Sequence, residues 1–253
     1  MACNYISSIY KGYAVTNSLM VNVEIDKQIV PRMLVSRFNV LEFFVVLPDS
    51  LKLDFQIEIF ANITKIFKIN TEYLKNDAPS FLFILAENLE YGFITVKDRQ
   101  IVTKFNDFLN PSGSTPIDQS EIKITQDLPR NSGNIILCNI AIYAFRGLFV
   151  LFSVNIRPDD ILVERTFKIR FPYEKTKDIG FISATKKPLL AILFEEDYGD
   201  QERAIHVYEV NEQSSELGKE PVWKINFSDD PNVERFESLR DGSIMVFSDL
   251  YIR

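Results

Sequence analysis

Residues 188–210 read PLLAILFEEDYGDQERAIHVYEV, two apolar runs joined by a strongly acidic connection. The connection holds five carboxylates, which are Glu195, Glu196, Asp197, Asp200 and Glu202. Two interpretations are open at this point. Five acids this close together suit a metal site or an acid–base pair, and they equally suit the solvated tip of a β-hairpin.

The hairpin interpretation needs fewer assumptions. Residues 189–194 and 204–210 are apolar runs of strand length, and Asp197-Tyr198-Gly199-Asp200 supplies turn-forming residues between them. The acidic residues match no calcium-loop spacing, and a glycosidase pair needs a cleft that a sequence does not reveal. We therefore expect two strands of one hairpin with an acidic turn, and no metal site.

Similar apolar runs, separated by polar turns, recur along the chain at a spacing of about 8–12 residues, which is typical of all-β proteins. Phe and Tyr suit half-buried pleated surfaces, and they are abundant at 21 and 10 residues. Residues 62–75 also fit a helical stripe, but we predict a strand in their first half because the neighbouring runs are β-rich. The other predicted strands are 13–23, 37–47, 51–60, 80–86, 91–96, 101–105, 134–144, 148–154, 167–171, 178–183, 189–194, 204–210, 222–227 and 243–247.

The region around residues 106–133 interrupts this rhythm. It is polar and holds three Pro and several Ser, and only Ile122 and Ile124 hint at a short strand. We expect a long surface loop inserted into one domain over 1–253, because the β rhythm resumes afterwards. The spacing of the runs fits a β-sandwich, a barrel or a propeller, and a repeat of roughly 40–50 residues, four strands each, would fit propeller blades, although the Trp-Asp and Gly-His signatures of the common propeller repeat are missing.

Composition narrows the class of protein. The 253 residues carry a formal net charge of −7 and no basic cluster, which disfavours direct duplex binding. Cys3 and Cys138 are too few for a disulfide framework, and Cys138 lies in an apolar run that predicts a buried thiol. The N-terminus lacks a secretory signal pattern, and no apolar run is long enough to span a bilayer. We expect a soluble intracellular protein.

Catalytic motifs are missing from the sequence. His206 is the only histidine and lies in a predicted strand, and neither a Gly-x-Ser-x-Gly motif nor a cluster of zinc ligands occurs. Gly113, Gly133 and Gly147 stand singly, so no phosphate-binding loop is present. The sequence therefore predicts a binding platform that is not an enzyme, with no cofactor, no metal and no catalytic residue.

The order of the runs resembles the N-terminal part of the DNA damage-binding protein 1 family, the adaptors of cullin-4 ubiquitin ligases. No single motif is diagnostic, and the resemblance lies in the collinear order of many weak ones over nearly the whole chain. The matching segments are NYISSIYKGYAVTNS (4–18), NVLEFFVVLPDSLKLDFQIEIFANITKI (39–66), LFILAE (82–87), GLFVLFSVNI (147–156), TFKIRF (166–171), AILFEEDYGDQERAIHVYEV (191–210) and GKEPVWK (218–224).

The resemblance implies an incomplete seven-bladed β-propeller of four-stranded antiparallel blades, with about five to six blades present. It implies a non-enzymatic scaffold of nucleus and cytoplasm that recruits substrate receptors for ubiquitination and DNA repair. The partners it implies are substrate-receptor proteins and the rest of the scaffold, with DNA contacted only through a partner subunit and no membrane. Direct cullin binding is not expected, since the family binds cullin through its second propeller.

The chain departs from the family in several places. Ala61 stands where the family tends to have glycine, and the sequence after Lys104 diverges. The family proteins are several times longer, so we expect this chain to cover most of the first propeller and to stop within a blade. Two alternatives remain: a related propeller scaffold of pre-mRNA splicing or 3′-end processing, and a β-rich hydrolase that uses the acidic loop.

Overall fold

The computed structural model describes residues 15–71, 78–109, 113–132, 135–157, 160–171, 175–182, 188–195, 203–211, 216–218, 220–227, 232–239 and 242–248. These residues form strands β1 to β20 and one short 3₁₀-helix, η1 (Gln119–Glu121). The predicted all-β class is confirmed: the strands form four-stranded antiparallel sheets, consistent with a partial β-propeller. The chain divides into two compact units, Met1–Asn110 with Pro158–Ile161, and Pro111–Arg157 with Leu162–Arg253.

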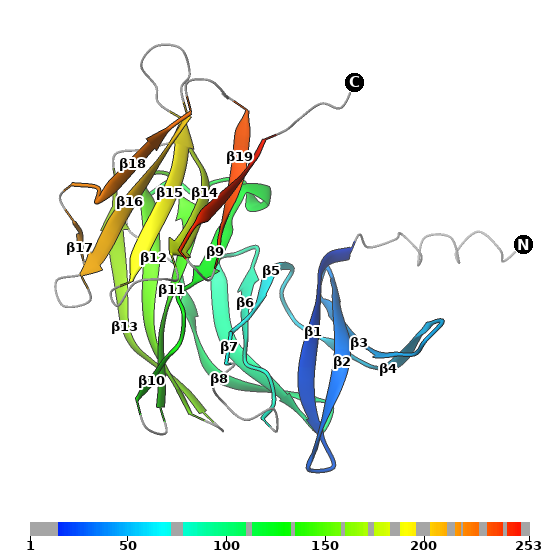
Figure 1. The fold of residues 1–253 in the computed structure, drawn as a ribbon. Helices are drawn as coiled ribbons and strands as arrows, with labels where there is room; N and C mark the ends of the chain where they lie inside the picture. Colours follow the sequence, from blue (N-terminus) through cyan, green and yellow to red (C-terminus); the bar gives the residue numbers. More distant parts are fainter. Residues whose placement is uncertain are drawn as a thin grey trace, which may run out of the picture. The chain divides into compact units, whose positions relative to one another are not determined.

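The first unit contains two sheets of four strands each (Figure 1). They meet at one parallel bridge, Glu24 to Lys97, which links all eight strands. Each sheet is otherwise a simple antiparallel meander in chain order. The first sheet is β1 (Val15–Ile25), β2 (Gln28–Arg37), β3 (Val40–Val46) and β4 (Leu51–Glu58), and the second is β5 (Ile63–Lys68), β6 (Leu82–Ala86), β7 (Glu90–Lys97) and β8 (Gln100–Phe108).

Tight turns set the register of these hairpins. Asp26 and Lys27 join β1 to β2 with φ of 51° and 62°, and Asp98 and Arg99 join β7 to β8 with 47° and 62°. Two consecutive positive φ angles define the two-residue turn whose twist matches that of paired strands. The facing sides of the two sheets then bury a common apolar core, which includes Val21, Val23, Ile25, Leu34, Leu41, Phe43, Ile63, Ile66, Leu82, Ile84, Ile94 and Val96.

The second unit repeats the four-stranded pattern with interruptions. Both β9 and β10 pair with the same side of β11, and both β17 and β18 pair with the same side of β16. Each pair therefore acts as one interrupted strand of its sheet. One sheet comprises β9 (Lys123–Gln126), β10 (Arg130–Ser132), β11 (Ile135–Phe145), β12 (Leu148–Arg157) and β13 (Asp160–Arg170), and the next comprises β14 (Thr176–Ile182), β15 (Leu189–Glu195), β16 (Arg203–Asn211), β17 (Glu216–Leu217) and β18 (Trp223–Asn226).

A two-stranded sheet, β19 (Val233–Ser238) and β20 (Ile244–Ser248), completes the described structure. The first strands of successive sheets are neighbours within each unit: β1 contacts β5, β9 contacts β14, and β14 contacts β19. Radial neighbourhood of first strands is the arrangement of propeller blades. Four four-stranded sheets and one hairpin lie at the low end of the expected five to six blades.

Each of the predicted strands overlaps a strand of the structure, and several further strands were missed. β2 was missed because it contains Pro31, which pairs with Asn22 of β1, whereas pairing with β3 begins only at Met33. Pro31 therefore needs no N–H on its second side. β19 was missed because charged residues interrupt its apolar ones, and the first half of β13 was missed because its apolar run is only three residues long, Ile161 to Val163.

The prediction of a long surface loop around residues 106–133 was wrong in part. It holds the end of β8, η1, β9 and β10, so part of it forms the first strand of a sheet instead of a long loop. Its strand partner is β11, whose pairing with β9 joins Ile140 to Gln126. The hint of a short strand at Ile122 and Ile124 is confirmed by β9, but the extent of the pairing was not visible locally, because the ladder is made with a separate run. The expected single domain over 1–253 stays a prediction.

Candidate functional site

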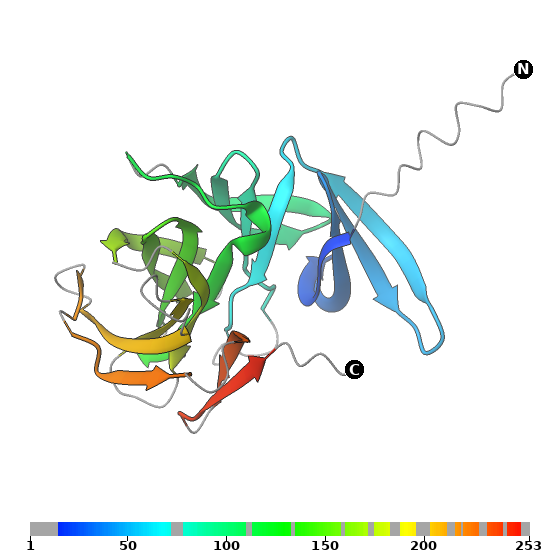
Figure 2. The same ribbon diagram turned by 90° about the horizontal axis from the view of Figure 1, so that it is seen from above.

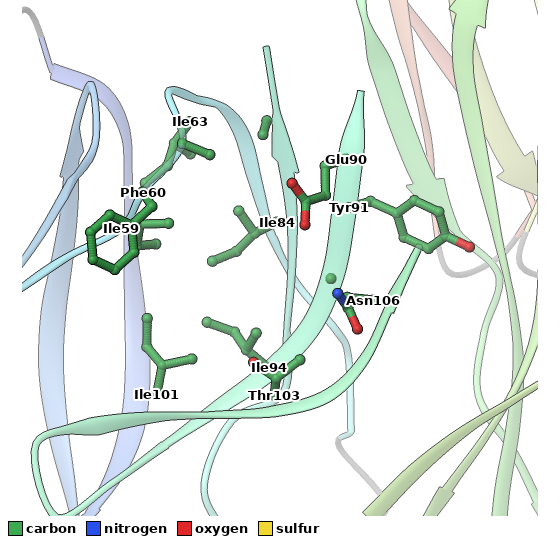
Figure 3. Close-up of a pocket in the computed structure, with 13 residues that line it drawn as sticks. Ile59, Phe60, Ile63, Ile84, Glu90, Tyr91, Ile94, Ile101, Thr103 and Asn106 are labelled. Carbon is green, nitrogen blue, oxygen red and sulfur yellow. The ribbon is translucent and has the colours of Figure 1, made fainter. Parts of the chain in front are cut away.

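An apolar hollow opens on the first unit between the β4–β5 connection and the sheet of β6, β7 and β8 (Figure 3). Its volume is about 270 Å³. Engineered apolar cavities of about 150 Å³ bind benzene, so this hollow has room for an aromatic ring or a branched aliphatic side chain. Its lining is Ile59, Phe60, Ala61, Ile63, Ile84, Ala86, Glu90, Tyr91, Gly92, Ile94, Ile101, Thr103 and Asn106.

The depth of the hollow comes from a glycine. Ile84, Gly92 and Asn106 are paired across β6, β7 and β8, so all three project from the same face of the sheet. A β-carbon built on Gly92 would have its nearest neighbour, the carbonyl oxygen of Phe105, at 3.4 Å, an ordinary contact. A side chain would therefore fit sterically at this position, and its absence leaves the space open.

Phe60 stands at the edge of the hollow with its side chain fully exposed. The connection that carries it is anchored at both ends: the N–H of Ile59 donates to Asn39 O at 2.7 Å, and the N–H of Ile63 donates to Phe38 O at 2.7 Å. The backbone of Asn62 also accepts from the N–H of Glu87 at 2.8 Å. An exposed aromatic ring on an anchored backbone is typical of a contact surface.

Among the described residues that line the hollow, Glu90 is the one with a charged side chain. Its carboxylate accepts from Asn88 Nδ2 at 3.4 Å, and its N–H donates to Asn88 Oδ1 at 3.1 Å. Figure 3 shows the Glu90 carboxylate turned toward the isoleucines, while the ring of Tyr91 points away from them. The hollow therefore combines an apolar floor with one negative charge.

The acidic connection between the apolar runs 189–194 and 204–210 is only partly described. The hairpin prediction is confirmed, since Leu189 pairs with Glu209 and Glu195 with Arg203 along β15 and β16. Glu195 itself forms ion pairs with Lys175 at 3.3 Å and Lys177 at 3.6 Å. The remaining acids, Glu196, Asp197, Asp200 and Glu202, lie outside the described residues.

A second hollow, in the second unit, is polar. It is lined by Ile117, Glu121, Tyr143, Arg146 and residues 175–177, with a volume of about 270 Å³. Burial raises the pKa of the Tyr143 hydroxyl, which is also hydrogen-bonded to Thr176. The Glu195 carboxylate reaches both lysines of this hollow, so much of their charge is compensated, and we regard the apolar hollow as the stronger candidate.

His206 and Cys138, two residues of types that catalysis and metal binding use, are both buried in strands. His206 is buried on β16, edge-on to the ring of Phe194 with 4.8 Å between centroids, as a strand residue. Cys138 is buried on β11, as predicted, while Cys3 lies outside the described residues. Among the residues that the structure describes, no three His, Cys, Asp or Glu side chains gather in a way that suits a metal ion.

One buried polar cluster was not predicted. Asp127 lies between β9 and β10, and its carboxylate accepts from the N–H of Asn139 at 2.6 Å and from Asn139 Nδ2 at 2.8 Å. The N–H of Asp127 donates back to Asn139 O at 2.9 Å. These bonds hold the backbone at Asp127, between β9 and β10, against Asn139 of β11. The cluster of Asp127 and Asn139 therefore has a structural role.

The apolar hollow, too, was not predictable from the sequence. Phe60 and Gly92 lie 32 positions apart and carry no motif, and only the pairing of β6, β7 and β8 brings the lining together. An exposed aromatic residue in an inter-strand connection is the one local signal available, and it is weak by itself.

The described sheets define a class of repeated four-stranded, propeller-like proteins, and no helix of the described residues is long and apolar enough to cross a membrane. No protein-family model matches the chain. The chain is 21% identical over 230 residues to DNA damage-binding protein 1a of Arabidopsis thaliana, with 89% of the chain and 19% of that protein covered. It is thus distantly related to this protein and spans about a fifth of its length.

Proposed function

We propose that the chain is a non-enzymatic protein-interaction scaffold, and that the apolar hollow of the first unit is a docking site for partner proteins. The observation that carries this proposal is the fully exposed Phe60 beside an apolar hollow of about 270 Å³. Large exposed aromatic residues at such hollows are typical anchors of protein–protein contacts. The distant similarity to DNA damage-binding protein 1a supports the same class.

The preferred occupant is a partner segment with a branched aliphatic or aromatic side chain next to a Lys or Arg. The apolar side chain would fill the space above Gly92 and pack on Phe60, burying apolar surface at about 25 cal/mol per Å². The basic side chain would pair with Glu90, the one charge of the lining. The net charge of −7 favours the approach of basic segments from a distance.

In the cell, the proposed role is recruitment of substrate receptors to a cullin-4 ubiquitin ligase in DNA repair, in nucleus and cytoplasm. The ion-paired Glu195 and the ordinary core environment of His206 support a function without catalysis. Under this proposal, DNA is reached only through a partner subunit, and this chain by itself does not capture cullin.

A peptide selection tests the docking site directly. A library of random 12-residue peptides is selected on the purified chain, and Kd values of the enriched peptides are measured by fluorescence anisotropy. We expect an enriched pattern of one apolar residue followed by Lys or Arg. Enrichment of acidic peptides, or of no common pattern, would overturn the proposed occupant.

Two substitutions localise the binding. Phe60→Ser removes the exposed ring, and Gly92→Val fills the hollow with a side chain that suits a strand. We expect each to weaken binding by about tenfold or more, since a lost apolar anchor costs about 1.5–3 kcal/mol. Leu51→Ser is the matched control, because Leu51 is exposed on β4 but does not line the hollow.

Affinity purification from source cells tests the cellular role separately. Recovery of ubiquitin-ligase components that depends on Phe60 supports the adaptor. Recovery of splicing or 3′-end factors instead supports the alternative scaffold. Direct capture of purified cullin-4 by this chain would contradict the proposal that this chain by itself does not bind cullin.

A further inference from the structure

The polar hollow of the second unit brings positive side chains together from separate elements. Arg146 lies in the turn between β11 and β12, Lys175 directly precedes β14, and Lys177 lies within β14. Figure 2 views the sheets of this unit from above, with β11 in green and β15 in yellow. The hollow has a volume of about 270 Å³. Cavities of about 150 Å³ admit benzene, so a phosphate group, which is smaller than that ring, fits here.

The backbone that carries these side chains is held in place on both sides of the hollow. The N–H of Arg146 donates to Thr115 O at 3.0 Å, which ties the β11–β12 turn to the segment before η1. The carbonyl oxygen of Lys175 accepts from the N–H of Glu195 at 3.1 Å, which ties the start of β14 to the end of β15. Charged side chains on an anchored backbone lose less conformational entropy when they bind a ligand.

Two hydroxyl groups complete the polar lining. Tyr143 is buried on β11, with its ring centroid 5.9 Å from that of Phe171, and its hydroxyl is hydrogen-bonded to Thr176. Burial raises the pKa of the Tyr143 hydroxyl, so this group stays protonated near neutral pH and does not repel an anion. Hydroxyl groups of Tyr and Thr are donors that suit the oxygens of an oxyanion.

The lysines of the hollow are only partly compensated. The Glu195 carboxylate lies 3.3 Å from the ammonium group of Lys175 and 3.6 Å from that of Lys177, so one negative charge is shared between two positive ones. Arg146 adds a third positive charge, whereas Glu121 is the one acidic residue among the described residues that line the hollow. Positive charge is therefore in excess, and exposed ion pairs of this length are weak enough to rearrange around a ligand.

We propose that this polar hollow binds a phosphate monoester, either as a small free ligand or on a phosphorylated side chain. A phosphate monoester carries nearly two negative charges at neutral pH and offers three terminal oxygens, so it uses more of these donors than a carboxylate could. The guanidinium of Arg146 can bond two of the oxygens at once, and Lys175 and Lys177 act as point charges. This inference is independent of the docking site in the first unit.

Nucleic acid is a poor match for the same hollow. Each phosphodiester carries a single charge, and the affinity of a nucleic acid comes from neutralising many phosphates along a basic surface. The chain has a net charge of −7, which opposes the approach of a polyanion. A ligand with one doubly charged group depends instead on the short-range contacts inside the hollow.

An NMR titration of the ¹⁵N-labelled chain at constant ionic strength tests the site. The probe is phenyl phosphate, and phenyl sulfate is the matched control because it has the same shape and a single charge. We expect saturable shifts at the amide groups of 146 and 175–177, with phenyl phosphate binding about fivefold or more tightly than phenyl sulfate because of its higher charge. Equal affinity for the two probes would overturn the assignment to a phosphate monoester.

Four substitutions locate the ligand. Arg146→Gln and Lys177→Gln should each weaken binding of phenyl phosphate by about tenfold, the usual effect of losing a charged hydrogen-bond donor. Lys224→Gln is the matched control, because Lys224 is exposed on β18 and does not line the hollow, and its Kd should stay within about twofold of the unsubstituted value. Glu195→Gln should instead tighten binding by about twofold to fivefold, since it releases both lysines.

The source of the phosphate is decided by a peptide, acetyl-AAXAA-amide with phosphoserine at X. Affinity at least about tenfold above that of phenyl phosphate would assign the group to a partner side chain, and similar affinity would assign it to a small ligand. Equal binding of the peptide with aspartate at X would contradict the proposal. So would the absence of saturable shifts, tighter binding of a single-stranded oligonucleotide, or equal losses in Arg146→Gln and Lys224→Gln.

Discussion

Gly180 of β14 lies directly beneath the ring of Phe236 of β19. A β-carbon built on Gly180 would lie 2.8 Å from Cε2 and 3.1 Å from Cζ of that ring. Two residues earlier, the carboxylate of Asp178 accepts from the N–H of Phe236 at 3.0 Å. The missing side chain at one position and the acceptor at the other together seat β19 on β14, since positions two apart project from the same face of a strand.

Substitution of Gly180 by Ala should destabilise the second unit. The new methyl group would overlap the Phe236 ring, and overpacking of this kind costs about 1–3 kcal/mol. Urea unfolding followed by circular dichroism measures the loss. Gly92→Ala is the matched control, because its β-carbon would make only ordinary contacts, and its unfolding free energy should change by less than about 1 kcal/mol. Equal effects of the two variants would contradict the close approach.

Asp178 should give the stability a specific pH dependence. Burial raises the pKa of its carboxyl above the ordinary value of 3.8, against the opposing effect of the hydrogen bond from the Phe236 N–H. A raised native pKa means that the folded chain binds this proton more tightly than the unfolded chain. The associated stability is therefore present below the ordinary pKa and is lost as the pH rises through the native pKa.

The measurement compares the chain with Asp178→Asn across a range of about pH 3.5 to 7, which begins below the ordinary pKa of 3.8 and extends upward in the direction of the shift. Relative to this variant, the unsubstituted chain should lose stability as the pH rises. Asp118 provides a control of opposite sign, since its hydrogen bonds with Ser120 lower the pKa of its carboxyl. Relative to Asp118→Asn, the unsubstituted chain should gain stability with rising pH. A stability difference for Asp178→Asn that does not vary with pH would contradict the assignment.

Asp127→Ala should weaken the first strand of its sheet. The substitution leaves the buried N–H and the side-chain amide of Asn139 without these acceptors, which costs about 1–3 kcal/mol for each buried donor. Thermal unfolding measures the change in Tm. Asp107→Ala is the control, because Asp107 is exposed on β8 and its carboxylate accepts from the neighbouring N–H of Phe108. Comparable Tm values for the two variants would show that the Asp127 cluster contributes little.

Cys138 should be chemically inert in the folded chain. Burial raises the pKa of its thiol, and the charge of Asp127 raises it further, so almost no thiolate forms near neutral pH. In a Cys3→Ser variant, reaction with Ellman's reagent at about pH 8 should be at least about 100-fold slower than in denaturant. Fast reaction under native conditions would mean that β11 opens readily.

Much of the fold was predictable because strands and tight turns are encoded locally. The alternating and apolar runs predicted β15, β16 and most other strands, since a side-chain period of two is visible in sequence. β2 escaped because Pro31 argues against a strand unless one knows that its second side begins to pair only at Met33. Ile122 and Ile124 hinted at the short strand β9, whereas β10 escaped because its sequence, Arg130-Asn131-Ser132, has no apolar residue.

The candidate sites were far less predictable than the strands. The acidic residues near Glu195 attract attention in the sequence, yet Glu195 is paired with Lys175 and Lys177 across two strands. The hollow depends on which residues share the face of β6, β7 and β8, and pairing registers of this kind are set by turns and packing together.

The sequence by itself determined the all-β class, the hairpin of β15 and β16, the buried Cys138 and the absence of a catalytic motif. Each of these follows from the local periodicity of apolar residues or from residue type. Only the tertiary structure decided that Gly92 leaves a hollow beside Phe60 and that Arg146 lines one hollow together with Lys175 and Lys177. Both features depend on strand register and on which faces meet. Register and packing arise from contacts between distant segments, so no short stretch of sequence contains them.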